Sequence, residues 1–295
     1  MNRMLLVLAT VFLAACGSPK VERRALIDVG EMAGMIESGS LPQIIDVRLE
    51  EAFVQGHIPG AVHLWRSDME NRLHELPGMR IEKDHLEQLL SRLGLFDHDS
   101  LFLYDAKGNV DAARLWWILR YYGFEKVALI DGGLTKWRME GLPEEVGEMR
   151  EKAGKFSFKN KLQDALLATK NDIHSGKYDQ IIDARSEEEY NGRVMKNGAI
   201  RSGHIPGAVL CDYYQYFSSS DMTIKNKDEV LEMLTQKGLS ADKNTAVYCH
   251  SGVRSAFTSF VLTEIAGWQD VANYDGSWIE WSSDEDLPIE GNSED

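Results

Sequence analysis

The chain of 295 residues carries the same three short motifs twice and in the same order. The second set follows the first at offsets of 137, 147 and 144 residues. Solenoid repeats have periods of about 20 to 50 residues, so this longer period indicates two duplicated domains of roughly 120 residues each. The pairs are IIDVR at 44–48 and IIDAR at 181–185, GHIPGAV at 56–62 and at 203–209, and DGG at 131–133 and DGS at 275–277.

Each copy alternates short apolar runs with segments of helical periodicity. The apolar runs have the length of strands and polar boundaries, whereas residues 112–122 and 256–265 have the spacing of a helix. This alternation favours an α/β fold of two tandem domains, each a mostly parallel sheet flanked by helices. The expected strands are 44–47, 100–104 and 127–130 in the first copy and 181–184 and 245–248 in the second.

The boundaries of the domains follow from the stretch between the copies. Residues 147–161 are charged and lack an apolar period, which predicts a linker between domains at 22–146 and 162–288. The offset rises from 137 to 147 between the first and second motifs. The second copy therefore contains an insertion, which we place at 191–202.

The first 15 residues have the pattern of an export signal. Arg3 precedes the apolar or small residues 4–15, a run shorter than the ~20 residues needed to span a bilayer. Leu-Ala-Ala-Cys at 13–16 resembles the bacterial lipobox, which implies a signal peptide at 1–15 and a lipid anchor on Cys16. Because Gly17 follows, an outer-membrane location facing the periplasm is expected in a double-membrane cell. The alternative is a buried cysteine in an N-terminal core helix.

Charge and cysteine content exclude other classes. The formal net charge is −15 and no run of basic residues is longer than 23–24, which argues against a nucleic-acid-binding surface. Three cysteines cannot form a disulfide framework, and no pair has the C-x-x-C spacing of a metal or thioredoxin-like site. Cys211 is expected to be a buried core residue, with a redox partnership with Cys249 as the alternative.

A short loop after the strand at 245–248 carries the chemistry. It begins with Cys249 and leads into a helix expected to start near Ala256. Backbone N–H groups between a strand and a helix N-terminus converge and favour an anion, so the thiol of Cys249 is expected to have a lowered pKa. Gly252 permits the tight backbone path. The candidate loop residues are His250, Ser251, Gly252, Val253, Arg254 and Ser255.

The repeated motifs, the C-x-x-G-x-R-S loop and the ending YDGSWIEW at 274–281 resemble the tandem-domain rhodanese family, the thiosulfate and 3-mercaptopyruvate sulfurtransferases. The resemblance covers about residues 25–285. It implies that Cys249 takes a sulfur atom from a small anionic donor as a persulfide and passes it to cyanide or a thiol, with no cofactor or metal. In that family only the second copy is catalytic, and here Asp105 stands in the first copy where Cys249 stands in the second.

Two interpretations of Arg254 stay open. It neutralises the anionic donor, or it braces the loop by bonding to carbonyls or to an acidic side chain; the planar group with five donors favours the brace. Ser251-Gly252-Val253 resembles the loop of mercaptopyruvate enzymes, in which a serine joins a histidine and an aspartate of the first domain. The nearest matches are His74 and Asp68, for which plain surface polarity is the alternative.

Arg193 and Arg201 are candidates for binding the donor. They lie in the insertion, a segment that reaches the rim of the active site in the family, and an arginine fork fits a carboxylate or sulfonate. The alternative is a pair of solvated loop charges. His57 and His204 occur in both copies, including the copy that lacks the cysteine, and are expected to be structural, as are Asp46, Arg48, Asp183 and Arg185.

Two rival functions remain at this stage. A cysteine-dependent phosphatase or arsenate reductase also places Cys and Arg on a loop that holds an anion, but those families have five residues between the two, and here there are four. The other rival is a lipoprotein that uses paired rhodanese domains for binding without catalysis. An intact Cys249 argues against the second.

Overall fold

The computed structural model describes residues 24–149 and 153–291. Within these ranges lie two sheets of five strands with the orders β1-β5-β4-β2-β3 and β6-β10-β9-β7-β8, and every pair of neighbouring strands is parallel. The predicted α/β fold of two tandem domains is therefore confirmed. The predicted signal peptide and Cys16 lie outside the described residues. In the described part of the chain, no helix is long and apolar enough to span a bilayer.

The elements of the two domains correspond one to one. The strands of the first domain are β1 Leu26–Ile27, β2 Gln43–Asp46, β3 Val62–His63, β4 Leu101–Tyr104 and β5 Val127–Ile130, and those of the second are β6 Leu167–Ala168, β7 Gln180–Asp183, β8 Val209–Leu210, β9 Thr245–Tyr248 and β10 Val271–Tyr274. The helices are α1 Val29–Glu37, α2 Glu50–Gln55, α3 Lys83–Arg92, α4 Val110–Tyr121 and α5 Gly133–Met139, then α6 Lys170–His174, α7 Glu187–Tyr190, α8 Lys227–Gln236, α9 Val253–Phe260 and α10 Ser277–Ser283. Short 3₁₀ turns are η1 Arg66–Met69, η2 Asp164–Leu166 and η3 Tyr213–Tyr216.

Helices cover both faces of each sheet, as strands that are apolar on both faces require. In the first domain, α1, α2 and α5 share one core with one face of the sheet, and in the second domain α6 and α10 do the same. The opposite faces carry α3 and α4 and, in the second domain, α8 and α9, and these four helices belong to a single core that spans both domains. The domains are therefore joined through a common hydrophobic core.

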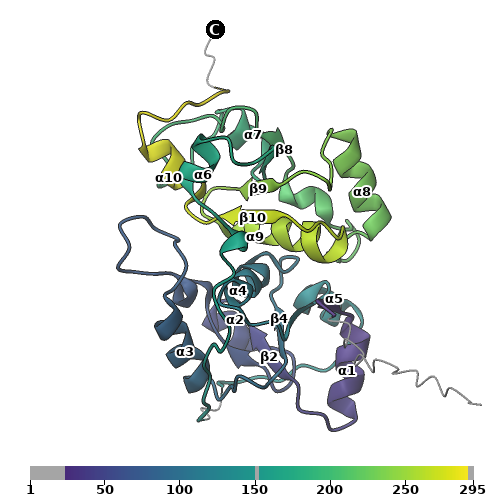
Figure 1. The fold of residues 1–295 in the computed structure, drawn as a ribbon. Helices are drawn as coiled ribbons and strands as arrows, with labels where there is room; N and C mark the ends of the chain where they lie inside the picture. Colours follow the sequence, from purple (N-terminus) through teal and green to yellow (C-terminus); the bar gives the residue numbers. More distant parts are fainter. Residues whose placement is uncertain (1–23, 150–152, 292–295) are drawn as a thin grey trace, which may run out of the picture.

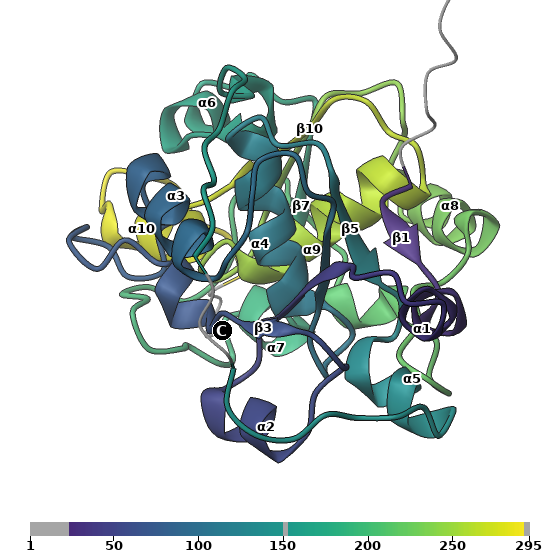
Figure 2. The same ribbon diagram turned by 90° about the horizontal axis from the view of Figure 1, so that it is seen from below.

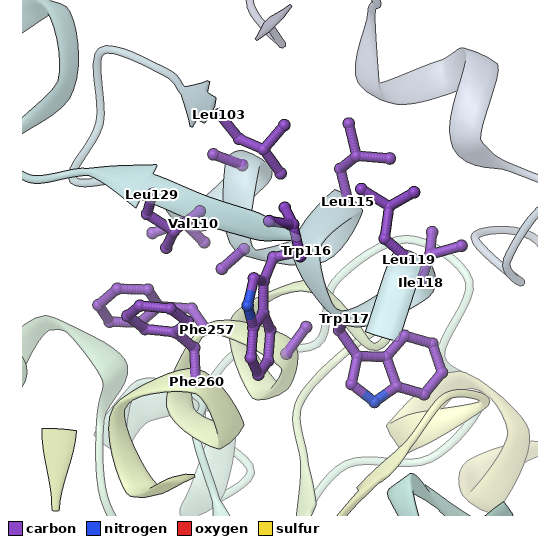
Figure 3. Packing of buried hydrophobic residues seen from close by; sticks show 14 of the residues in the cluster. Leu103, Val110, Leu115, Trp116, Trp117, Ile118, Leu119, Leu129, Phe257 and Phe260 are labelled. Atoms are coloured by element: carbon purple, nitrogen blue, oxygen red, sulfur yellow. The ribbon is translucent and has the colours of Figure 1, made fainter. Parts of the chain in front are cut away.

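Helices α4 and α9 form the contact between the domains. They face each other between the two sheets (Figure 1) and cross near the centre of the molecule in the perpendicular view (Figure 2). Trp116 of α4 meets Phe260 of α9 edge to face, with ring centroids 4.9 Å apart (Figure 3). Because α9 follows the cysteine loop, the first domain packs directly against the helix that carries this loop.

The start of α9 differs from the prediction. The helix begins at Val253 rather than near Ala256, so Val253, Arg254 and Ser255 form its first turn. The loop from Cys249 to Gly252 is one residue shorter than its counterpart in the first domain, which runs from Asp105 to Asn109. A π-helical turn at Val261–Ile265 contains one extra residue, which restores the alignment of the second copy with the first before Gly267.

Candidate active site

The D-x-R motifs form the framework behind the cysteine loop. Arg185 bonds Asp183 through Nε and Nη2, at 3.0 and 2.6 Å, and also donates to the carbonyl of Gly203. The hydroxyl of Tyr248, at the end of β9, donates to the same carboxylate at 2.6 Å. In the first domain, Asp46, Arg48 and Tyr104 make the same bonds. This repetition confirms the predicted framework role of Asp46, Arg48, Asp183 and Arg185.

The sulfur of Cys249 lies at the centre of a small loop. The side chain is buried, and its Sγ accepts a hydrogen bond from the hydroxyl of Ser255 at 3.4 Å. Burial raises the pKa of the thiol, but the charge of Arg254 and hydrogen bonds from Ser255 and from the backbone of Ser251 outweigh it, so the pKa lies below its ordinary value. The geometry therefore favours a thiolate, as predicted.

Gly252 is required by the shape of the loop. Its φ is +76°, and a Cβ there would lie 2.7 Å from the carbonyl oxygen of Asp275. Its N–H and that of Cys249 both donate to the hydroxyl of Ser277, at 3.0 and 3.1 Å. Ser277 in turn donates to the carbonyl of Tyr274. Ser277 thus ties the loop to the end of β10 and keeps these two N–H groups away from the sulfur.

Arg254 braces the loop through Glu189. Its Nη1 and Nη2 donate to the two carboxylate oxygens at 2.7 and 2.8 Å. The favoured prediction of a brace to an acidic side chain is thereby confirmed. Burial raises the pKa of Glu189, but Arg254 and Lys196 outweigh it and lower the pKa to about 2. Burial lowers the pKa of Arg254, while Glu189 and the thiolate of Cys249 raise it above its ordinary value.

The first domain contributes a buried cation to the same loop. Arg114 of α4 donates to the carbonyls of Gly252 and Gly78, at 3.2 and 3.0 Å, and lies 2.6 Å from the carboxylate of Asp275. Arg80 makes a second ion pair with Asp275 at 2.9 Å. Burial raises the pKa of Asp275, but Arg114 and Arg80 outweigh it and hold the pKa below its ordinary value. This network fixes the position of the cysteine loop relative to the first domain.

The equivalent loop of the first domain is filled by its own side chain. Both carboxylate oxygens of Asp105 accept backbone N–H bonds, from Lys107 and Asn109 at 2.6 and 2.7 Å and from Asp111 and Ala112 at 2.8 and 3.3 Å. Burial and the charge of Asp111 raise the pKa of Asp105 to about 6 despite these bonds. The first domain therefore shows how such a loop holds an anion, but leaves no room for sulfur chemistry.

Two segments contact the cysteine loop from outside. The insertion reaches the loop, because Nε2 of His250 bonds the carbonyl of Asn197 at 2.9 Å. From the first domain, Gly78 approaches Ser251 so closely that a Cβ on Gly78 would lie 3.1 Å from the Cβ of Ser251. Gly198 of the insertion also approaches Pro77, at 4.0 Å from a Cβ built on Gly198. The insertion and the first-domain segment thus approach each other, and each contacts the cysteine loop.

The two predicted donor-binding arginines differ in their surroundings. Arg193 is exposed, and its side chain makes no hydrogen bond or ion pair with the described residues. Arg201 instead bonds the backbone, and its guanidinium donates to the carbonyls of Ser282, Leu287, Trp281 and Asp284. Its guanidinium closes the end of α10, so the geometry does not support Arg201 as a donor-binding residue.

The predicted group of Asp68, His74 and Ser251 is not joined in this structure. His74 is exposed, and its Nδ1 accepts from the N–H of Leu76 at 3.0 Å. Asp68 pairs with Arg72 at 3.2 Å. No hydrogen bond between described residues links the three side chains. The segment that carries His74 reaches the cysteine loop through Gly78, which contacts Ser251 and shares Arg114 with Gly252.

The remaining predicted residues have structural surroundings. His57 bonds the carbonyl of Phe53 and stacks on its ring, and His204 does the same with Tyr190, which confirms their structural role. Cys211 is buried, and burial raises its pKa to about 12. Within 24–149 and 153–291, no three histidine, cysteine or acidic side chains come together as metal ligands.

The comparisons agree with this geometry. A family model described as the rhodanese-like domain matches residues 28–140 and 167–284. The chain belongs to the rhodanese family. The predicted resemblance is therefore confirmed, and the two matched ranges correspond to the two sheets described above.

Rhodanese relatives cover most of the chain. A mitochondrial protein of Arabidopsis thaliana named thiosulfate/3-mercaptopyruvate sulfurtransferase 1 is 34% identical over 258 residues, or 79% of this chain and 67% of its own length. A Mycobacterium bovis protein, provisionally named a thiosulfate sulfurtransferase, is 33% identical over 267 residues, which cover 84% of this chain and 92% of its own. Both names support sulfurtransferase activity in general.

A solved structure shows the same fold. The anaerobic ergothioneine biosynthesis enzyme of Chlorobium limicola, in complex with trimethyl histidine, superimposes with a TM-score of 0.81 over 91% of this chain and 70% of its own. The identity is 23%, and the likeness therefore concerns the fold alone.

Sequence reasoning missed the residues that hold the loop in place. Glu189, Ser277 and Arg114 all contact it, but none was singled out as a candidate site residue. A signal existed for two of them: Glu189 and Ser277 differ from their counterparts Ala52 and Gly133 in the first copy. Arg114 carries no such signal, because its contacts depend on how the domains dock.

Proposed function

We propose that the chain transfers a sulfane sulfur from a small anionic donor to a thiophilic acceptor through a persulfide on Cys249. The observation that supports this most strongly is the buried thiol with a lowered pKa inside a loop of N–H groups. A thiolate is the nucleophile that such a reaction needs, and the surrounding donors stabilise the negative persulfide.

The two half-reactions balance without a further reactant. With thiosulfate, the Cys249 thiolate attacks the outer sulfur, a new S–S bond forms, the old S–S bond breaks and sulfite leaves with the electron pair. With 3-mercaptopyruvate, the Cys249 thiolate attacks the thiol sulfur, so that an S–S bond forms and the carbon–sulfur bond breaks. The thiol proton passes to the carbon, and pyruvate leaves. Cyanide or a thiolate then attacks the outer sulfur and regenerates the thiolate.

The donor is held, in our proposal, by positive charge at the rim. Arg193 lies on the insertion, whose Asn197 contacts His250, and its guanidinium is exposed. Ser251, with His74 and Asp68 from the first domain, is proposed to act on 3-mercaptopyruvate. Closure of the segment 71–79 onto Ser251 would be needed to join the three, and the contact of Gly78 with Ser251 supports this direction.

We also propose that the protein is exported and anchored by a lipid on Cys16, at the outer membrane and facing the periplasm. The basic start, the apolar run and the small residues before Cys16 support this. Labelling cells with a radioactive fatty acid should mark the wild type but not a Cys16→Ala variant. Equal labelling of both would refute the anchor.

Steady-state assays test the activity directly. Thiocyanate formed from cyanide should be measured with thiosulfate and with 3-mercaptopyruvate for the wild type, for Cys249→Ser and for the control Cys211→Ser. We expect turnover that Cys249→Ser abolishes and Cys211→Ser retains. No turnover with either donor would favour a binding protein, and phosphate release from an aryl phosphate would favour a phosphatase.

A further inference from the structure

Glu189 and Arg254 form a buried ion pair beside the sulfur. The Glu189 side chain is 3% exposed and that of Arg254 13%, and both guanidinium nitrogens bond the carboxylate. A buried cation without an anionic partner is strongly unfavourable. Arg254 therefore depends on Glu189 to stay inside, and the thiolate of Cys249 is a further anion close enough to interact with its charge.

The two copies of the domain show that this pair accompanies the cysteine. The offset of the D-x-R motif places Ala52 where Glu189 stands. Arg254 is the second residue of α9, and the second residue of α4 is Asp111. The copy with Asp105 at the strand end has therefore neither half of the pair.

Short-range contacts fix the carboxylate itself. Glu189 lies in the first turn of α7, where it accepts from the hydroxyl and N–H of Ser186 at 3.3 and 3.4 Å. Lys196 of the insertion adds an ion pair at 3.2 Å with its side chain 49% exposed. The other charges near Arg254 are Asp183, which Arg185 already pairs, and Asp212 at the start of η3.

We propose that Glu189 is a positioning residue for sulfur transfer: it holds the guanidinium of Arg254 beside Cys249, so that this cation stabilises the thiolate and is not free to bind the donor. This inference rests on the proposed function of Cys249. Both terminal nitrogens of the Arg254 guanidinium bond Glu189, so the donor must be bound by residues at the rim of the site.

The test measures the thiolate directly, as the rate of iodoacetamide alkylation of Cys249 against pH. Without Glu189, we expect Arg254 to turn toward solvent. The midpoint pH of alkylation in Glu189→Gln should then lie about one pH unit above that of the wild type, which means about tenfold less thiolate at pH values below the midpoint. Glu189→Asp keeps the charge but shortens the reach, so its midpoint should lie between the two. Glu188→Gln, on the exposed face of the same helix, is the control and should match the wild type.

A double variant separates positioning from stability. Glu189→Gln/Arg254→Met removes both buried charges and should recover much of the urea midpoint that either single change loses, while its alkylation midpoint stays raised and kcat stays low. If stability and kcat recover together, the pair is only structural. An unchanged or lowered alkylation midpoint in both Glu189→Gln and Glu189→Asp would overturn the proposal, because Arg254 would then remain in place without Glu189.

The alkylation readout does not depend on sulfur transfer. A raised midpoint in the variants together with no turnover of any donor by the wild type would refute the proposed function and leave the placement of Arg254 standing. Turnover by the wild type with unshifted midpoints would refute the positioning role alone.

Discussion

Asp105 and Cys249 stand at the same point of the two domains, directly after β4 and β9, and each begins the loop that leads into the following helix. Asp105 fills its loop with a carboxylate. Cys249 fills its loop with a single sulfur atom, whose donors are Ser255 and the backbone of Ser251.

The carboxylate of Asp105 should make stability depend on pH. Its folded pKa of about 6 exceeds the ordinary value of 3.8, so the folded state binds the extra proton between these values and stability falls as pH rises through that window. Asp105→Asn removes this titration. The difference in unfolding free energy between wild type and variant should therefore change by up to about 3 kcal/mol from pH 4 to pH 7. A constant difference across this range, measured by urea denaturation, would contradict the raised pKa.

Gly252→Ala should damage the loop more than an ordinary glycine substitution. Both Gly252 and Gly60 have positive φ, +76° and +79°, but a Cβ on Gly252 meets Asp275 whereas nothing lies within 4 Å of one on Gly60. We expect Gly60→Ala to cost about 1 kcal/mol through backbone strain with wild-type activity. Gly252→Ala should cost more and lose most sulfur transfer. Equal stability and activity of the two variants would show that the loop has room to relax.

Arg114 should matter for both stability and catalysis although it belongs to the first domain. Arg114→Met leaves Asp275 with Arg80 alone and removes one donor from the carbonyl of Gly252, which should destabilise the protein by about 3 kcal/mol and lower kcat. The control is Arg138→Met, since Arg138 pairs with Glu144 at the surface and should cost under about 1 kcal/mol. Chemical denaturation gives the stability. Similar losses in the two variants would refute the special role of the buried network.

The donor preference tests the proposed group of Ser251, His74 and Asp68. Ser251→Ala and His74→Ala should each lower kcat/KM for 3-mercaptopyruvate at least about tenfold more than for thiosulfate, because only the former requires a proton to reach carbon. Arg193→Met should raise KM for both donors. Equal losses with both donors for Ser251→Ala would leave Ser251 with loop support alone.

The repeated motifs predicted the fold because the lengths of apolar runs and the residues of turns reflect the local backbone geometry. Cys249, its lowered pKa and the brace by Arg254 followed from one loop between a strand and a helix. The start of α9 was not predicted correctly. Val253, Arg254 and Ser255 were assigned to the loop, because their place in the helix depends on tertiary packing.

Long-range contacts account for the remaining differences. Arg201 is drawn to four carbonyls at the end of α10, some 80 residues away in sequence, a pairing that no motif records. Arg114 likewise reaches Gly252 only because α4 docks on α9. Contacts of this kind are set by the docking of domains and helices, which sequence periodicity does not specify.

The central claim is that Cys249 carries the sulfur. The most direct measurement is to incubate the protein with thiosulfate or 3-mercaptopyruvate, remove the donor, digest the protein and determine the masses of the peptides. We expect a mass gain of about 32 Da, one sulfur atom, on the peptide with Cys249, and its loss after treatment with cyanide. No gain on Cys249 with either donor, or a gain on Cys211 instead, would contradict it.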